Sequence, residues 1–293
     1  MTALEDDLPA ASEPPRAAEP VARRRLGLVG LTYAYRALAG LLIALPVAMV
    51  VGGPVSAWPH GQAHLFDPGG VMLVEALRFM RHGIGPVVVE VLLVAALALI
   101  AGVIPLAILL CGLDREGRLP VGFLAGRAAS RAGTLALLSL VTVLAQAIVG
   151  ALLALLGSKL VGAFDLTARG ADMANAALVA VVLAAVCALG VLRDLAFAAS
   201  VRRELRFYSA AASALRVARR SGGRALGAWA YRAALGAVGL ALAAWLAPSI
   251  AGASAAAIVA GAVLHQAAIV GMAFAHASWL AAAMRLHDAA TAP

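Results

Sequence analysis

The sequence predicts an all-α, polytopic membrane protein with six transmembrane helices and additional interfacial amphipathic helices. Hydrophobic residues make up 63% of the chain and charged residues only 13%, whereas soluble domains average about 45–50% and about 25%. Six apolar runs are long enough to cross ~30 Å of hydrocarbon. Arginines gather mainly between these runs, which is the pattern expected at a membrane surface.

The distribution of the basic residues predicts the orientation of these helices. Of the 23 Lys and Arg residues, 19 lie in segments 1–36, 114–132, 193–232 and 281–293, and four lie in the intervening loops. Because basic loops stay in the cytoplasm, we expect cytoplasmic N- and C-termini. A composition rich in alanine and arginine, with one lysine, indicates a GC-rich bacterial genome and therefore a multi-pass protein of the inner (plasma) membrane. The clustering also favours membrane lipids over nucleic acid as a partner.

The chain is expected to begin with a disordered cytoplasmic tail, residues 1–30, because its first 20 residues hold five acids and four prolines. The six-helix domain is predicted over residues 31–285, and a short cytoplasmic tail over residues 286–293. The first transmembrane helix is expected from Ala37 to Trp58, with a kink at Pro46.

The first external loop, residues 59–85, is predicted to contain a short amphipathic helix that begins after Asp67. His60 and His64 precede it with the spacing of metal ligands on a helix. A proline and a glycine beside these histidines disfavour a helix there, so we expect no metal site.

The second transmembrane helix is predicted from about Gly85 to Leu113, with a bend at Pro105. Glu90 lies near its outer end. It either reaches the interface or pairs with a nearby arginine, or it serves a function within the membrane. The cytoplasmic loop that follows, residues 114–131, is expected to carry another interfacial helix.

The third transmembrane helix is predicted over about Gly133 to Leu156. Gln146 lies near its middle, where such a side chain usually forms a hydrogen bond to a neighbouring helix. An external loop at residues 157–173 then leads to the fourth helix, which is expected to begin near Ala174.

The most basic stretch, residues 193–232, contains nine of the 23 Lys and Arg residues. It opens with Arg193 and Asp194 at the cytoplasmic edge of the fourth helix. Neighbouring opposite charges favour a local ion pair that lets the helix continue inward, and contact with a substrate is the alternative.

Helical periodicity within this stretch predicts an interfacial amphipathic helix. One stripe is basic and hydroxylated, with Arg202, Arg206, Ser209, Ser213, Arg216 and Arg220, and another is apolar, with Leu205, Tyr208, Ala212, Leu215 and Ala218. Ser221-Gly222-Gly223 is expected to end the helix. We predict that Arg202, Arg206, Arg216 and Arg220 contact anionic lipid headgroups. The alternative is that these arginines only set the orientation of the protein.

The fifth helix is predicted from Ala230 to Ala247, closed by Pro248, and the sixth from Ala255 to Leu280. On the sixth helix His265, Met272, His276 and Trp279 share one face. Hydrogen bonding between helices is the preferred interpretation, with a proton relay or haem ligation as alternatives. Haem is disfavoured because no other predicted span contains a histidine. The polar residues expected within the membrane are Glu90, Gln146, Arg193, Asp194, His265, Gln266 and His276.

Two of the helical hairpins begin with similar residues. Tyr33-Ala34-Tyr35-Arg36-Ala37 opens the first helix, and Trp229-Ala230-Tyr231-Arg232-Ala233 opens the fifth. This similarity indicates three hairpins of one design, each entered through a basic interfacial segment.

In this layout, and in the segment from Ser213 to Ala233, the chain resembles the membrane domain attached to some glycerophosphodiester phosphodiesterases and the stand-alone bacterial relatives of that domain. The segment matches their Ala-Leu/Arg/Ser amphipathic helix before the fifth span. Gly222 follows Ser221 where those proteins often have a tryptophan. The resemblance implies a six-span fold over about residues 30–285. This sequence contains no soluble phosphodiesterase domain, so no catalytic residue carries over.

No catalytic, metal-binding or nucleotide-binding motif stands out in the sequence. We therefore expect a membrane scaffold, accessory subunit or lipid-contacting subunit that is not an enzyme and uses no cofactor. The alternative is a small transporter or permease subunit with a polar path through the helix bundle. The expected partners are anionic lipids on the cytoplasmic side, and the sequence names no protein partner.

Overall fold

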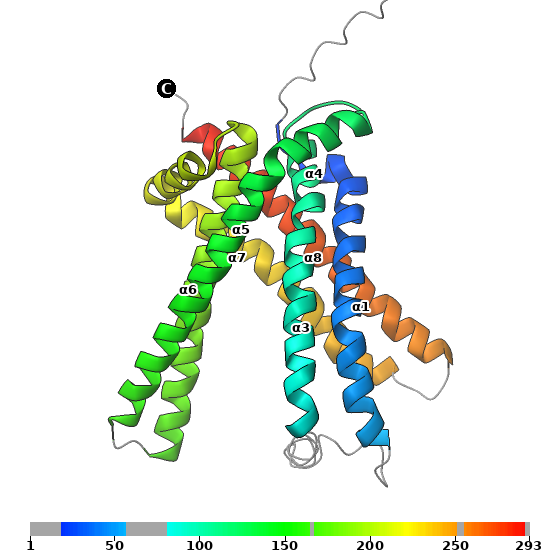
Figure 1. The fold of residues 1–293 in the computed structure, drawn as a ribbon, viewed down its shortest axis with the longest axis vertical. Coiled ribbons are helices and arrows are strands. Elements are labelled where there is room, and N and C mark those ends of the chain that lie inside the picture. The colour runs from blue at the N-terminus through cyan, green and yellow to red at the C-terminus, as the bar shows by residue number, and fades with distance from the viewer. Residues whose placement is uncertain (1–18, 57–80, 165–166, 251–254, 291–293) are drawn as a thin grey trace, which may run out of the picture. The chain divides into compact units, whose positions relative to one another are not determined.

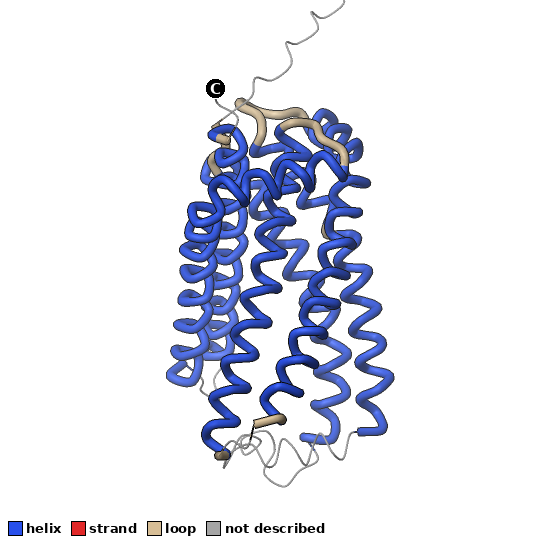
Figure 2. The backbone as a smooth tube through the Cα atoms, turned by 90° about the vertical axis from the view of Figure 1, so that its left-hand side faces the viewer, coloured by secondary structure: helices blue, strands red, loops and turns tan. Residues whose placement is uncertain are grey.

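The fold is all-α, as the sequence predicts. The computed structural model describes residues 19–56, 81–164, 167–250 and 255–290, and within these ranges it contains helices and loops but no strand (Figure 2). Six helical stretches are long and apolar enough to cross a membrane. The prediction of a multi-pass membrane protein is therefore confirmed. The external helix expected after Asp67 and the pair His60 and His64 lie outside the described residues.

The chain packs as two units, which are described separately. Residues 30–106 form one, and residues 1–29 with 107–293 form the other. The helices, labelled in Figure 1, are α1 (Leu26–Ser56), α3 (Arg81–Ala101), α4 (Val103–Leu113), α5 (Val121–Gly162), α6 (Ala168–Arg202), α7 (Phe207–Ile250) and α8 (Ala255–Ala289). A short 3-10 turn, η1 (Ala22–Arg25), precedes α1.

In the unit of residues 30–106, the predicted second span is two helices, and the break lies at Gly102 rather than at Pro105. Pro105 has no N–H to donate to the carbonyl of Ala101, so the helical ladder is interrupted one turn earlier. Gly102 also lies against α1, because a Cβ atom there would be only 3.1 Å from Cε1 of Tyr35. The Tyr35 hydroxyl donates to the carbonyl of Ala98. α1 itself begins at Leu26, earlier than the predicted Ala37.

Helices α5 and α6 form a hairpin that is longer than predicted. α5 is one continuous helix of 42 residues that starts after Pro120, so no separate interfacial helix precedes it. The expected loop at residues 157–173 is largely helical, because α5 continues to Gly162 and α6 begins at Ala168. The hydroxyl of Thr167 caps α6 by accepting a hydrogen bond from the backbone N–H of Gly170 at 3.2 Å.

Helices α7 and α8 pack along each other and against α6. α7 departs from helical geometry at Ser221 (φ −139°, ψ 29°), which confirms that the amphipathic segment ends there. Beyond this break α7 continues to Ile250, past the predicted stop at Pro248. α8 continues to Ala289, so most of the predicted C-terminal tail at residues 286–293 is helical.

Buried side chains concentrate at one end of the larger unit. They include Phe197 on α6 and Trp279 and Met284 on α8, each at most 1% exposed. Along the rest of these helices large apolar side chains point outward, as Leu144 and Leu155 do on α5. Outward apolar side chains are expected where the surrounding medium is lipid rather than water.

Candidate functional site at the arginine-rich end

The buried end of the larger unit is also where its charged residues meet. It comprises the loop at residues 114–120, the first turns of α5, the last turns of α6 and α8, the linker at residues 203–206 and the first segment of α7, residues 207–221. We call this region the arginine-rich end. It contains an ion-pair network, two buried polar contacts between helices, and an exposed amphipathic helix.

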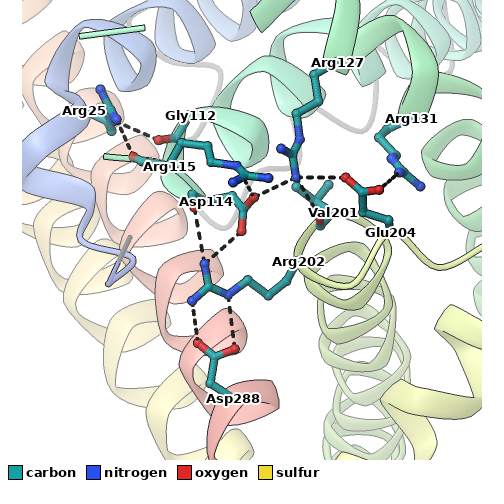
Figure 3. A network of polar contacts seen from close by, with 10 residues as sticks. All are labelled: Arg25, Gly112, Asp114, Arg115, Arg127, Arg131, Val201, Arg202, Glu204 and Asp288. Atoms are coloured by element: carbon teal, nitrogen blue, oxygen red, sulfur yellow. Dashed lines mark hydrogen bonds and ion pairs between the residues drawn. The ribbon is translucent and has the colours of Figure 1, made fainter. Parts of the chain in front are cut away.

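The network centres on Asp114, which follows α4 and is 2% exposed. Its carboxylate lies 2.9 Å from Nη1 of Arg202 on α6 and 2.8 Å from Nη2 of Arg127 on α5. Arg202 also holds Asp288 on α8 through two hydrogen bonds of 3.0 and 3.1 Å (Figure 3). These three charge pairs tie the ends of α4, α5, α6 and α8 together.

Electrostatic effects on Asp114 oppose one another. Burial is the largest and raises the pKa of Asp114 above its ordinary value, because a charged carboxylate is costly away from water. The hydrogen bond from Arg202 and the positive charges of Arg127 and Arg115 act in the opposite direction. The arginines therefore offset part of the cost of burying the Asp114 carboxylate, and the carboxylate balances part of their positive charge.

Glu204 extends the network into the linker between α6 and α7. Its carboxylate lies 3.4 Å from Nη2 of Arg127 and 3.2 Å from Nη2 of Arg131. Its backbone has φ 56°, a left-handed conformation that is costly for a residue with a Cβ atom. The two ion pairs, in which the Glu204 side chain is 57% exposed, accompany this conformation in the linker between α6 and α7.

Residues before α1 are also fastened to this end. Nε of Arg25 donates to the carbonyl of Gly112 at 2.7 Å, and Nη1 donates to the carbonyl of Gly117 at 2.8 Å. Arg285 on α8 donates to the carbonyl of Pro20. The predicted disordered tail, residues 1–30, is therefore ordered in its described part.

A second buried carboxylate, Asp194, connects α6 to α8. The predicted ion pair with Arg193 is present, with Nη2 at 3.0 Å from Oδ1. Trp279 donates its indole N–H to Oδ2 at 2.9 Å, and Nε2 of His276 lies 3.6 Å from the same oxygen. The hydrogen bond from Trp279 to Asp194 was not predicted. The sequence indicated only that Trp279 shares a helical face with His276, which favours contact with another helix.

His287 forms the other buried polar contact. It is fully buried, with Nε2 at 2.8 Å from the carbonyl of Leu195 on α6 and Nδ1 at 3.5 Å from Oγ of Ser213 on α7. This contact was not predicted, because residues 286–293 were expected to form a tail.

The first segment of α7 presents three faces. Ala210, Ser213, Ala214 and Val217 are at most 5% exposed and pack inward. Tyr208 and Leu215 form an outward apolar face, 84% and 44% exposed. Beside it lie the exposed side chains of Arg216, Arg219 and Arg220.

The residues predicted to contact lipid headgroups thus fall into two groups. Arg206, Arg216 and Arg220 are exposed, and Arg220 also donates to the carbonyl of Ala290 at 3.2 Å. The position of Arg202 differs from the one predicted. It lies in the last turn of α6 rather than on the amphipathic helix, and its side chain is only 15% exposed and pairs with two carboxylates.

The polar residues predicted within the membrane have different surroundings. Gln146 donates to the carbonyl of Val186 on α6 at 2.9 Å, which confirms its predicted bond between helices. His265 contacts the carbonyl of Gly261 on its own helix at 2.8 Å, and the carboxylate of Glu90 is on an exposed residue of α3. Gln266 is exposed on α8. His276 lies beside Asp194.

The arrangement at this end can anchor helices and attract anions. Among the described residues, no group of three or more His, Cys, Asp or Glu could hold a metal ion. Comparison of the chain with protein-family models, with curated proteins and with solved structures finds no match.

Proposed function

We propose that this chain is a multi-pass protein of a bacterial inner membrane that serves as a scaffold or accessory subunit, without catalysis of its own, and contacts anionic lipid. We place the arginine-rich end in the cytoplasm, because loops rich in arginine are retained there. The layout is similar to the membrane domain attached to some glycerophosphodiester phosphodiesterases.

The observation that carries the proposal is the first segment of α7. One face is buried against the bundle, and the outward side carries Tyr208 and Leu215 with Arg219 on the same stripe and Arg216 beside it. A helix with adjoining apolar and basic faces lies in the plane of the interface, with apolar side chains at the acyl boundary and cations at the headgroups.

The segment is also fixed at both ends before any lipid binds. Glu204 holds the preceding linker through Arg127 and Arg131, and Arg220 is bonded to the end of α8. A pre-ordered surface loses less conformational entropy on binding than a flexible one. This supports a lasting lipid contact rather than a role in orientation alone.

A pair of charge-matched variants tests the proposal. Arg216→Gln with Arg219→Gln removes two exposed charges from the amphipathic segment. Lys159→Gln with Arg169→Gln removes two exposed charges from the opposite ends of α5 and α6. The purified proteins are placed in nanodiscs of mixed phosphatidylglycerol and phosphatidylcholine, and the lipid that remains bound after extraction is quantified.

We expect the first variant to lose anionic lipid and the control to keep it. At roughly 1 kcal/mol per charge, the free energy of lipid binding weakens by at most about 2 kcal/mol, and by less in high salt. Equal retention by the two variants would leave these arginines with a role in orientation only.

The transporter alternative has less support. A polar path needs side chains that face a common passage, whereas Gln146, His265 and His276 each contact a different nearby group.

A further inference from the structure

A groove lies between α7 and α8, away from the amphipathic segment. Its volume is about 290 Å³. Its walls are mainly apolar, with Ala237, Leu240 and Met272 along its length, and Trp229, Arg232 and His276 also line it. Gly236 sets its depth. A Cβ atom there would be 3.2 Å from Cγ of Met272, so the two helices approach closely at this point.

Arg232 is the unusual residue of the groove. Its guanidinium donates to Oγ of Ser278 at 2.9 Å and to the carbonyl of Ala228 at 2.8 Å, both of which are neutral acceptors. Within residues 19–56, 81–164, 167–250 and 255–290, Arg232 forms no ion pair with a carboxylate. A second cation, Arg285 on α8, lies close enough to act on it electrostatically.

A cation on a membrane helix is costly unless an anion accompanies it. Three other arginines of the larger unit, Arg127, Arg193 and Arg202, each have a carboxylate within 3.0 Å. Arg232 instead has an apolar groove beside it and Arg285 as its neighbour. The position lacks an anion and offers room for a hydrocarbon chain next to it.

We propose that one anionic phospholipid occupies this groove. Its phosphate pairs with Arg232, with Arg285 adding to the positive field, and one acyl chain lies along Ala237, Leu240 and Met272. Trp229 also lines the groove, and indole rings favour the level of the headgroups. The apolar walls select a lipid over a free phosphate ion, because they have no contact to make with an inorganic anion.

This site is separate from the basic face of α7. It involves neither Arg216 nor Arg219, so either site can fail its test while the other passes.

The test uses the full-length protein in a neutral detergent, with phosphatidylglycerol or phosphatidylcholine added and bound lipid counted by native mass spectrometry. We expect the unaltered protein to keep one more phosphatidylglycerol than Arg232→Gln does, at concentrations where phosphatidylcholine is lost. Arg232→Gln should weaken this retention by about tenfold or more. Arg224→Gln, at an exposed position on the same helix, should leave it unchanged.

A second variant tests the groove independently, in case Arg232→Gln does not fold. Ala237→Leu, at an exposed position in the groove wall, fills the space for the acyl chain and keeps Arg232. We expect it to lose the lipid as well. Retention by both groove variants, equal retention of the two lipids, or displacement of phosphatidylglycerol by excess inorganic phosphate would each overturn the proposal.

Discussion

At the scale of single residues, the structure separates charges that hold the fold from charges that face outward. Asp114 and Arg202 belong to the first kind, since their side chains are 3% and 15% exposed and contact each other at 2.9 Å. Arg24 and Glu116 belong to the second, at 3.8 Å and more than half exposed. The two pairs differ in burial more than in chemistry, so they allow a direct comparison.

Replacing Asp114 by alanine leaves Arg202 and Arg127 buried without their shared carboxylate. We expect the free energy of unfolding in detergent to fall by about 3 kcal/mol. Glu116→Ala is the matched control and should change it by less than about 1 kcal/mol. Similar small effects for both variants would mean that the network contributes little to stability.

The indole of Trp279 is expected to matter as a hydrogen-bond donor and not only as a large apolar group. Trp279→Phe keeps most of the ring and removes the bond to Asp194, at a cost of about 1.5–3 kcal/mol, typical of a hydrogen bond to a charged group. Trp245→Phe, at a side chain that is 73% exposed, is the control. Thermal unfolding of the two variants in the same detergent measures the difference.

At the scale of elements, the linker between α6 and α7 depends on both the backbone and the side chain of Glu204. Glu204→Ala loses the two ion pairs and keeps the left-handed strain, whereas Glu204→Gly loses the ion pairs and relieves it. We expect both variants to be less stable than the natural protein, and the alanine variant to be the worse by about 1 kcal/mol. Denaturation in mixed micelles can rank the three proteins, and the reverse order of the two variants would contradict this account.

The helices and their number could be predicted from the sequence, because long apolar runs bounded by arginines leave few alternatives in a membrane. The residues at which these helices begin and end could not be predicted. α5 continues through Gly157 and Ser158 to Gly162, and α6 already begins at Ala168, because tertiary packing overrides local helix preference.

The candidate site was predictable only where its partners are close in sequence. Arg193 with Asp194 is such a case. Arg202 with Asp114 and Trp279 with Asp194 join residues more than 80 positions apart, and helical periodicity does not indicate which faces of two distant helices meet. The same limit explains why Arg202 was assigned to lipid.

At the scale of the whole molecule, both the charged network and most of the buried residues of the larger unit lie at the arginine-rich end. The topology follows from the same asymmetry. Reporter fusions after residues 20, 118, 205 and 290 should report the cytoplasm, and fusions after residues 65, 165 and 252 should report the outside. One pair of reporters with inverted signals would contradict the six-span arrangement.

The continuity of α5 has a consequence for the membrane around it. Arg131, held by Glu204, and Lys159 near the other end of the helix are separated by about 42 Å at 1.5 Å per residue. That separation matches the ~40–45 Å thickness of a bilayer with its headgroups. In a thinner bilayer the helix must tilt or deform the lipid around it, at a cost that grows with each ångström of mismatch. The spacing of these two charges therefore sets the bilayer thickness that the protein prefers.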